Sequence, residues 1–131
     1  MNDEINKDSG AIMVAAATSA HPHQKIVQSN FGSRVDCFAW GENITTTGDG
    51  DIGDSPTAYT DTFDGTSGAS AIIAGAAVAI QSMCETKFGS RFYPASLRDI
   101  LRNPAYGTQP GPGHAIGVMP DLQKIYNGEI A

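Results

Sequence analysis

The chain has 131 residues, of which 40% are hydrophobic, 17% are charged and 15 are glycine. This composition predicts a compact folded domain with many turns and disfavours a disordered chain. The net charge of −6, with eight scattered Lys and Arg residues, disfavours nucleic acid and anionic membrane surfaces as partners, because both attract clustered positive charge.

The sequence predicts no segment that crosses a membrane or directs secretion. The longest apolar run, centred on residues 72–80, is short for a bilayer and contains Gly75, and the chain opens with polar residues. Without a signal peptide in the chain, the cellular compartment stays open. The two cysteines, Cys37 and Cys84, are too few for a disulfide framework and lack metal-site spacing, so we expect two free thiols.

The first third of the chain predicts two strands of a parallel sheet. Residues 10–17 form a continuous apolar run, which is typical of a strand buried on both faces. Residues 18–25 are polar and predict a loop, in which we expect His21 and His23 to be solvated surface histidines. Residues 34–39 predict the second strand.

The remainder predicts a surface loop followed by helices. Residues 45–64 are rich in Thr, Gly and Asp and predict mostly loop, with a short strand around residues 58–62. Residues 66–84 predict a helix that is apolar all round and therefore buried in a larger body. Residues 94–102 predict an amphipathic helix, and residues 120–125 a short terminal one. The elements together predict an α/β architecture.

The segment Asp64-Gly-Thr-Ser-Gly-Ala-Ser-Ala-Ile-Ile-Ala-Gly75 carries the chemistry, because it places Ser67 where a helix of small apolar residues begins. The unpaired N–H groups and the dipole at a helix start favour a developing negative charge. Thr66 precedes the serine, and Gly65 and Gly68 leave space around its hydroxyl. The ordinary alternative is that Ser67 or Thr66 is only the N-cap of a buried helix.

This segment resembles the Gly-Thr-Ser-x-Ala-Ser nucleophile motif of the subtilisin-like serine peptidases. The likeness extends over nearly the whole chain in the right order, through a strand, a turn, a second strand and a later helix. These regions are residues 10–16, 29–32, 35–41 and 97–101. The chain departs from the family pattern at Gly68, Ala71 and Ile72, where Met, Pro and His are usual, and none of these changes removes a reacting group.

The resemblance implies a serine endopeptidase that forms an acyl-enzyme at Ser67 and needs no cofactor or metal. In this family the triad runs Asp, His, Ser along the chain, and the oxyanion-hole Asn also precedes the serine. The family's His-Gly-Thr motif is absent from the chain. We therefore expect residues 1–131 to be the C-terminal fragment of a three-layer, subtilisin-like domain, with a buried central helix starting at Ser67. The complete protein is expected to be active and the fragment alone inactive.

Several other residues imitate site residues of this family. Asp8 opens an Asp-Ser-Gly sequence like that of the catalytic aspartate, but it lies close before Ser67 with no His motif between them. Asn30 and Asn43 follow the first strand, whereas the family's oxyanion asparagine is expected before it. His114 lacks a helix-start context. We assign none of these residues to the catalytic machinery.

Two rival interpretations come from other functional classes. A phosphate-binding loop is favoured by the helix start at residues 64–70, but the segment lacks the Lys of a P-loop. A non-catalytic binding or structural module is the other rival, with calcium held by the acidic loop at residues 48–54. Its spacing does not fit an EF-hand, and a solvated loop is the favoured interpretation.

The expected partner is a peptide or protein substrate. If the missing portion of the domain supplies strands beside residues 10–17, the chain exposes an apolar edge. We then expect it to form a homo-oligomer or to pair with the N-terminal portion of the domain.

Overall fold

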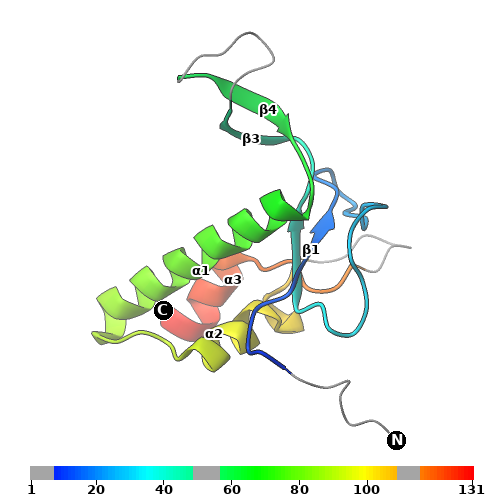
Figure 1. Cartoon of the computed structure of the whole chain (residues 1–131). Helices are drawn as coiled ribbons and strands as arrows, with labels where there is room; N and C mark the ends of the chain where they lie inside the picture. Colours follow the sequence, from blue (N-terminus) through cyan, green and yellow to red (C-terminus); the bar gives the residue numbers. More distant parts are fainter. Residues whose placement is uncertain (1–7, 49–56, 109–115) are drawn as a thin grey trace, which may run out of the picture.

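The computed structural model describes residues 8–48, 57–108 and 116–131. It is a mixed α/β structure in which a small parallel pair of strands packs on one long helix (Figure 1). The strands are β1 (Val14–Ala17) and β2 (Cys37–Trp40), and the helix is α1 (Thr66–Phe88). The α/β prediction is confirmed at this level.

Both faces of the strand pair are covered. β1 and β2 are parallel, with Val14 opposite Cys37 and Ala17 opposite Trp40. On one face Ala16 and Cys37 pack with residues of α1, and on the other face Ala17 packs with residues around Met119. The predicted burial on both faces is therefore confirmed for Val14–Ala17, whereas residues 10–13 of the predicted strand lie before β1, with Ala11 and Met13 exposed. Its small side chains let a helix approach one face while the C-terminal segment covers the other.

The outer edge of β1 is partly closed by the chain itself. The N–H of Ile26 donates to the carbonyl oxygen of Ala16 over 3.1 Å, and the N–H of Ala16 donates to the Ser29 hydroxyl over 2.8 Å. The exposed edge expected beside residues 10–17 is thus occupied at Ala16. Because loop residues supply these partners, the continuous apolar run of the strand could not have shown them.

A β-hairpin stands apart from the helices, above the start of α1 (Figure 1). It consists of β3 (Ile44–Thr47) and β4 (Tyr59–Phe63), which are antiparallel with an irregularity between Ile44 and Thr46. The strand predicted around residues 58–62 is confirmed, whereas β3 lies in a stretch predicted to be mostly loop. Its half-exposed threonines carry little of the apolar signal that marks a buried strand.

Helix α1 begins and ends at glycines. Gly65 precedes it with φ 95°, and Gly89 ends it in the left-handed conformation with φ 69°, which a glycine adopts without steric cost. The helix runs one turn beyond the predicted end at Cys84. By length and composition it also meets the requirement for crossing a membrane, and one face of it packs on β1 and β2.

Only one face of α1 is buried, so the predicted burial on all sides is wrong for the described structure. Ile73 and Ile80 lie in the core, whereas Ala71, Ala74 and Val78 are exposed, and Val78 retains 70% of its accessible surface. These three residues recur at intervals of three and four, so they share one face of the helix. We call Ala71, Ala74 and Val78 the bare face of α1.

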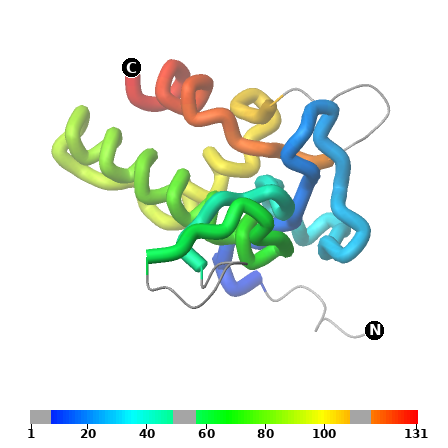
Figure 2. The backbone as a smooth tube through the Cα atoms, turned by 90° about the horizontal axis from the view of Figure 1, so that it is seen from above, coloured from blue at the N-terminus to red at the C-terminus, as the bar shows by residue number. Residues whose placement is uncertain are grey.

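Of the remaining helices, α3 and η3 contact α1 directly, η2 contacts α3, and α2 shares the core cluster of α1. They are α2 (Pro94–Leu101), the 3₁₀ turn η2 (Pro104–Tyr106), α3 (Leu122–Ile125) and the π-helical turn η3 (Tyr126–Ile130). Figure 2 shows the C-terminal segment (red) beside α1 (green), in agreement with the contacts between α1, α3 and η3. Leu101 and Ile125 are fully buried with Ile80. The amphipathic helix and the terminal helix are confirmed.

Both cysteines are free, as predicted, and both are buried. Burial, followed by the charge of the neighbouring Asp36 carboxylate, raises the pKa of the Cys37 thiol to about 12. Cys37 is therefore a packing residue of β2 and a poor nucleophile at neutral pH.

Candidate active site

Two glycines fix the place where α1 begins. The N–H of Gly65 donates to the carbonyl oxygen of Gly41, the residue after β2, over 2.8 Å. A Cβ at Gly41 would collide with Ala16 and lie 3.2 Å from the carbonyl oxygen of Gly65. The close approach of these two backbones holds the first turn of α1 against the C-terminal end of β2.

Ser67 is the second residue of α1, and its side chain is exposed. The carbonyl oxygen of Gly65 accepts from the N–H groups of Gly68 and Ala69, at 3.2 and 3.4 Å. Within the described part of the chain, the N–H groups of Thr66 and Ser67 and the Ser67 hydroxyl have no hydrogen-bond partner. Two backbone donors and a hydroxyl are thus presented together at the positive end of a long helix.

The ordinary N-cap interpretation of this serine does not hold. The N-cap of α1 is Gly65, and no side chain forms a capping hydrogen bond. Both Thr66 and Ser67 already lie inside the helix. Ser70, one turn later, is engaged differently, because its hydroxyl donates to the carbonyl oxygen of Thr66 over 2.8 Å. Among these three hydroxyl residues, Ser67 is exposed and has no bonded partner among the described residues.

Gly68 is buried beneath the β-hairpin. A Cβ at this position would collide with Ile44 of β3 and lie 3.2 Å from an edge carbon of Phe63 of β4. The sequence indicated that Gly68 leaves space around the hydroxyl. The structure adds a steric reason for this glycine, which is the contact between the hairpin and the first turn of α1.

A cavity of about 480 Å³ opens beside this turn. It is bounded by the ends of β1 and β2, the segment that closes the edge of β1, and the residues that precede α1. Its wall includes Gly41, Glu42, Asp64, Gly65 and Thr66. Gly65 and Thr66, which directly precede the serine in sequence, thus lie with the end of β2 in the wall of one cavity.

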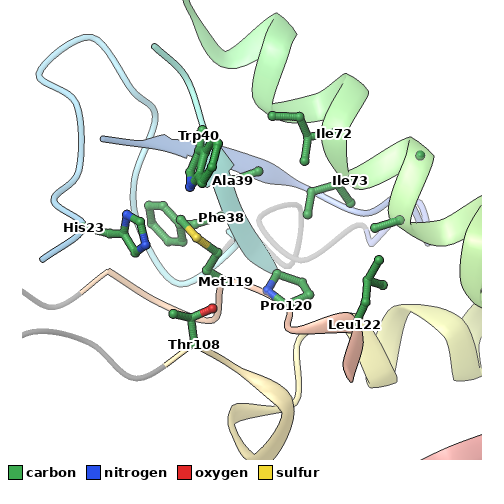
Figure 3. Close-up of a pocket in the computed structure, with 12 residues that line it drawn as sticks. His23, Phe38, Ala39, Trp40, Ile72, Ile73, Thr108, Met119, Pro120 and Leu122 are labelled. Atoms are coloured by element: carbon green, nitrogen blue, oxygen red, sulfur yellow. The ribbon is translucent and has the colours of Figure 1, made fainter. Parts of the chain in front are cut away.

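No described histidine forms a hydrogen bond with Ser67. His21 is exposed, as predicted, but His23 is buried, with 8% of its surface accessible. The prediction of a solvated His23 is therefore wrong. Its Nδ1 lies 2.8 Å from the carbonyl oxygen of Thr18, which can only accept, and the ring lies beside Phe38 (Figure 3). A serine hydroxyl without a base is a weak nucleophile.

Asp8 belongs to an ion-pair network with Arg34 and Arg98 that does not include Ser67. Its carboxylate lies 2.7 Å from Nη1 of Arg98 and 2.9 Å from Nη2 of Arg34. A hydrogen bond from the N–H of Gly10, followed by one from Arg98, lowers the pKa of Asp8. These contacts account for the Asp-Ser-Gly sequence as an anchor of the chain before β1.

Asp36 is the buried centre of the same network, and its side chain is 4% exposed. It lies 3.0 Å from Nη2 of Arg98 and accepts from the N–H of Met13 over 2.8 Å. Burial acts to raise the pKa of Asp36, but the hydrogen bonds from Arg98 and Met13 outweigh it, so the pKa is lowered. The network ties α2 to the residues before β1 and β2.

The other sequence candidates do not join Ser67. Asn43 donates from Nδ2 to the Ser19 hydroxyl over 3.0 Å, and Asn30 is an exposed loop residue. His114 and residues 49–54 of the acidic loop lie outside the described residues, so the calcium interpretation is not tested. Within residues 8–48, 57–108 and 116–131, no group of three His, Cys, Asp or Glu side chains gathers as a metal site would require.

A sequence model of the subtilase family matches residues 4–118. The chain belongs to the subtilase family. Subtilases, peptidase family S8, are serine peptidases, so the family prediction from the Gly-Thr-Ser segment is confirmed. No curated protein matches the chain. The assignment of Ser67 as the subtilase nucleophile, with Gly65, Thr66 and Gly68 as its supports, stays a prediction.

Two contributors to the candidate site were not predicted. Gly41 was noted only as the end of the resembling region 35–41, although a glycine directly after a buried strand indicates close approach of another backbone. The contact of Ile44 and Phe63 with Gly68 joins residues far apart in sequence, and no local pattern signals it.

Proposed function

We propose that Ser67 is the nucleophile of a serine endopeptidase. Its oxygen forms a bond to the carbonyl carbon of the substrate, while a base takes the hydroxyl proton and passes it to the leaving amine. The C–N bond breaks, and water then hydrolyses the acyl-enzyme and restores the serine. The observation that carries this proposal is the exposed hydroxyl, without a bonded partner among the described residues, at the start of α1 in a subtilase.

The start of α1 supports the negative charge that this reaction develops. The unpaired N–H of Ser67 is available to the oxyanion of the tetrahedral intermediate, and the helix dipole acts in the same direction. Gly65 and Gly68 place the turn, and Thr66 lines the adjacent cavity. The reaction needs no cofactor, because a hydroxyl, a base and hydrogen-bond donors carry it.

We place the catalytic Asp and His and the oxyanion Asn outside residues 1–131. In this proposal the chain is the C-terminal portion of a three-layer domain, and alone it is inactive. The bare face of α1 supports the proposal, because an apolar helix face of this kind is normally covered in a folded domain. The remainder of the domain would cover it. In the isolated chain, a pair of copies would instead associate through this face.

A fluorophosphonate probe tests the nucleophile and the missing base separately. We expect rapid labelling at Ser67 in the complete protein and essentially none in the 131-residue chain. In the complete protein, Ser67→Ala should abolish peptidase activity; in subtilisin, on which the magnitude was measured, loss of the serine costs about 10⁶-fold in kcat.

Ser70→Ala is the matched control, since it removes a hydroxyl one turn away that is already bonded to Thr66. It should retain labelling. Equal labelling of the isolated chain would contradict the need for an external base. Full activity of Ser67→Ala would refute the nucleophile itself.

A further inference from the structure

A second cavity, of about 490 Å³, lies between β2, α1 and the segment that leads into α3 (Figure 3). It shares no lining residue with the cavity beside Ser67. Its described lining residues are mostly aromatic and aliphatic, and none of them is Asp, Glu, Lys or Arg. They include the large apolar side chains of Phe38, Trp40, Ile73 and Met119 and the polar side chains of His23 and Thr108.

His23 brings a polar atom without a bonded partner to this largely apolar wall. The residue is more than nine-tenths buried, and its Nδ1 must carry the proton that is shared with the carbonyl oxygen of Thr18 over 2.8 Å. In the neutral ring, Nε2 is then an acceptor, and no described residue donates to it. Nε2 keeps some accessible surface, because no fully buried side-chain nitrogen or oxygen of the described residues lacks a partner, and His23 is one of the residues that line the cavity.

We propose that this cavity binds a small, neutral aromatic molecule that carries one hydroxyl group, such as a phenol. The ring lies among Phe38, Trp40 and Met119, and the hydroxyl donates to Nε2 of His23. The volume is that of a small-molecule pocket, and apolar walls with very few oriented polar groups are the usual composition of such sites. Aromatic rings and a methionine thioether favour an aromatic ligand.

The same composition argues against a charged ligand and against a strand of polypeptide. A charged molecule would find no counter-charge in the wall. An extended peptide carries an N–H and a C=O at every residue, and these need partners once buried. Among the described residues that line the cavity, the side chains that can form hydrogen bonds to a ligand are those of His23, through Nε2, and Thr108, through its hydroxyl, apart from the indole N–H of Trp40. A ligand with one hydroxyl donor on an apolar ring matches these few hydrogen-bonding groups.

The chain contains a single tryptophan, Trp40, and it lines the cavity, so its fluorescence reports occupancy. We would titrate the chain with 4-bromophenol, whose bromine quenches tryptophan, and with 4-bromoanisole, in which a methyl group replaces the donated hydrogen. We expect saturable quenching by 4-bromophenol and about five- to tenfold weaker binding of 4-bromoanisole, the loss of one hydrogen bond. His23→Phe should remove the difference between the two probes.

A cavity-filling variant provides the second arm. Gly75 lines the cavity, and a Cβ there meets no heavy atom within 4 Å, so Gly75→Leu fills the space without disturbing the helix. It should abolish saturable quenching, while Val78→Leu on the bare face of α1 should not. Circular dichroism checks that each variant is folded. Equal affinity of the two probes for the unaltered chain, or only linear collisional quenching in all variants, would overturn the proposal.

Discussion

The backbone nitrogen of Gly65 and the carbonyl oxygen of Gly41 are 2.8 Å apart, so the residue that precedes α1 is hydrogen-bonded directly to the residue after β2. Ser67 follows two residues later. The position of the proposed nucleophile thus depends on a backbone contact that any side chain at Gly41 would disturb, because a Cβ there would lie 2.8 Å from Cδ1 of Ile26 and 3.2 Å from the oxygen of Gly65.

Gly41→Ala should therefore displace the first turn of α1. We expect kcat/KM of the complete protein to fall about 100-fold, the cost of misplacing a reacting group by about 1 Å. Peptidase assays measure the change in kcat/KM, and urea unfolding measures the change in the free energy of unfolding. Gly75→Ala is the control, because it adds a methyl group without a contact and should stabilise the helix by up to about 1 kcal/mol. Unchanged kcat/KM in Gly41→Ala would show that this contact does not place the serine.

Gly68→Ala should destabilise the chain by about 1–3 kcal/mol, because its methyl group collides with Ile44 of the hairpin. The collision involves Cδ1 of Ile44, which valine lacks. In the double variant Gly68→Ala, Ile44→Val, we expect the total loss to be smaller than the sum of the single losses. Urea denaturation of the four proteins tests this coupling, and strictly additive losses would contradict the contact.

Asp36→Asn should lower the free energy of unfolding by about 3 kcal/mol. This is the lower end of the range for removing one partner of a buried ion pair, since Arg98 keeps Asp8. Asp99→Asn is the control at the exposed pair with Arg102, and it should cost less than about 1 kcal/mol. Similar losses in both variants would show that the burial of Asp36 has no energetic consequence.

The same network predicts acid lability. The pKa values of Asp8 and Asp36 are lowered in the fold from an ordinary value of 3.8. Their stabilising effect is therefore complete above that value and is lost as the pH falls through their folded pKa values. Thermal unfolding between pH 6 and pH 2 should show a decline below about pH 4. The decline should be smaller in Asp36→Asn, and an identical profile in that variant would assign it to other carboxyl groups.

Self-association is expected through the bare face of α1. Light scattering after size exclusion should show a mass that rises with concentration for the unaltered chain. Val78→Lys places a charge at the C-terminal end of this face and should yield a monomer, whereas Val27→Lys, at an even more exposed valine in the loop, should not. A monomer at all concentrations in the unaltered chain would contradict the proposed contact.

The sequence predicted those elements whose residues carry their own periodic pattern. The apolar run at residues 10–17 and the amphipathic α2 were recognised because burial follows local spacing. Burial of His23 was not predictable in this way. It results from contacts of this loop residue with the Thr18 carbonyl and with Phe38 of β2, which is distant in sequence. For α1, composition indicated burial on all sides. The described residues supply a cover for only one of them.

The hairpin is in contact with the residue next to the proposed nucleophile. Ile44 and Phe63 pack against Gly68, which is joined to Ser67 by a single peptide bond, while the strands themselves project away from the helices. A protein that binds the strands and changes their orientation would therefore shift Ser67 without contacting it. An antibody fragment raised against this projection would act as a remote modulator of the hydroxyl, and its effect would pass through one glycine.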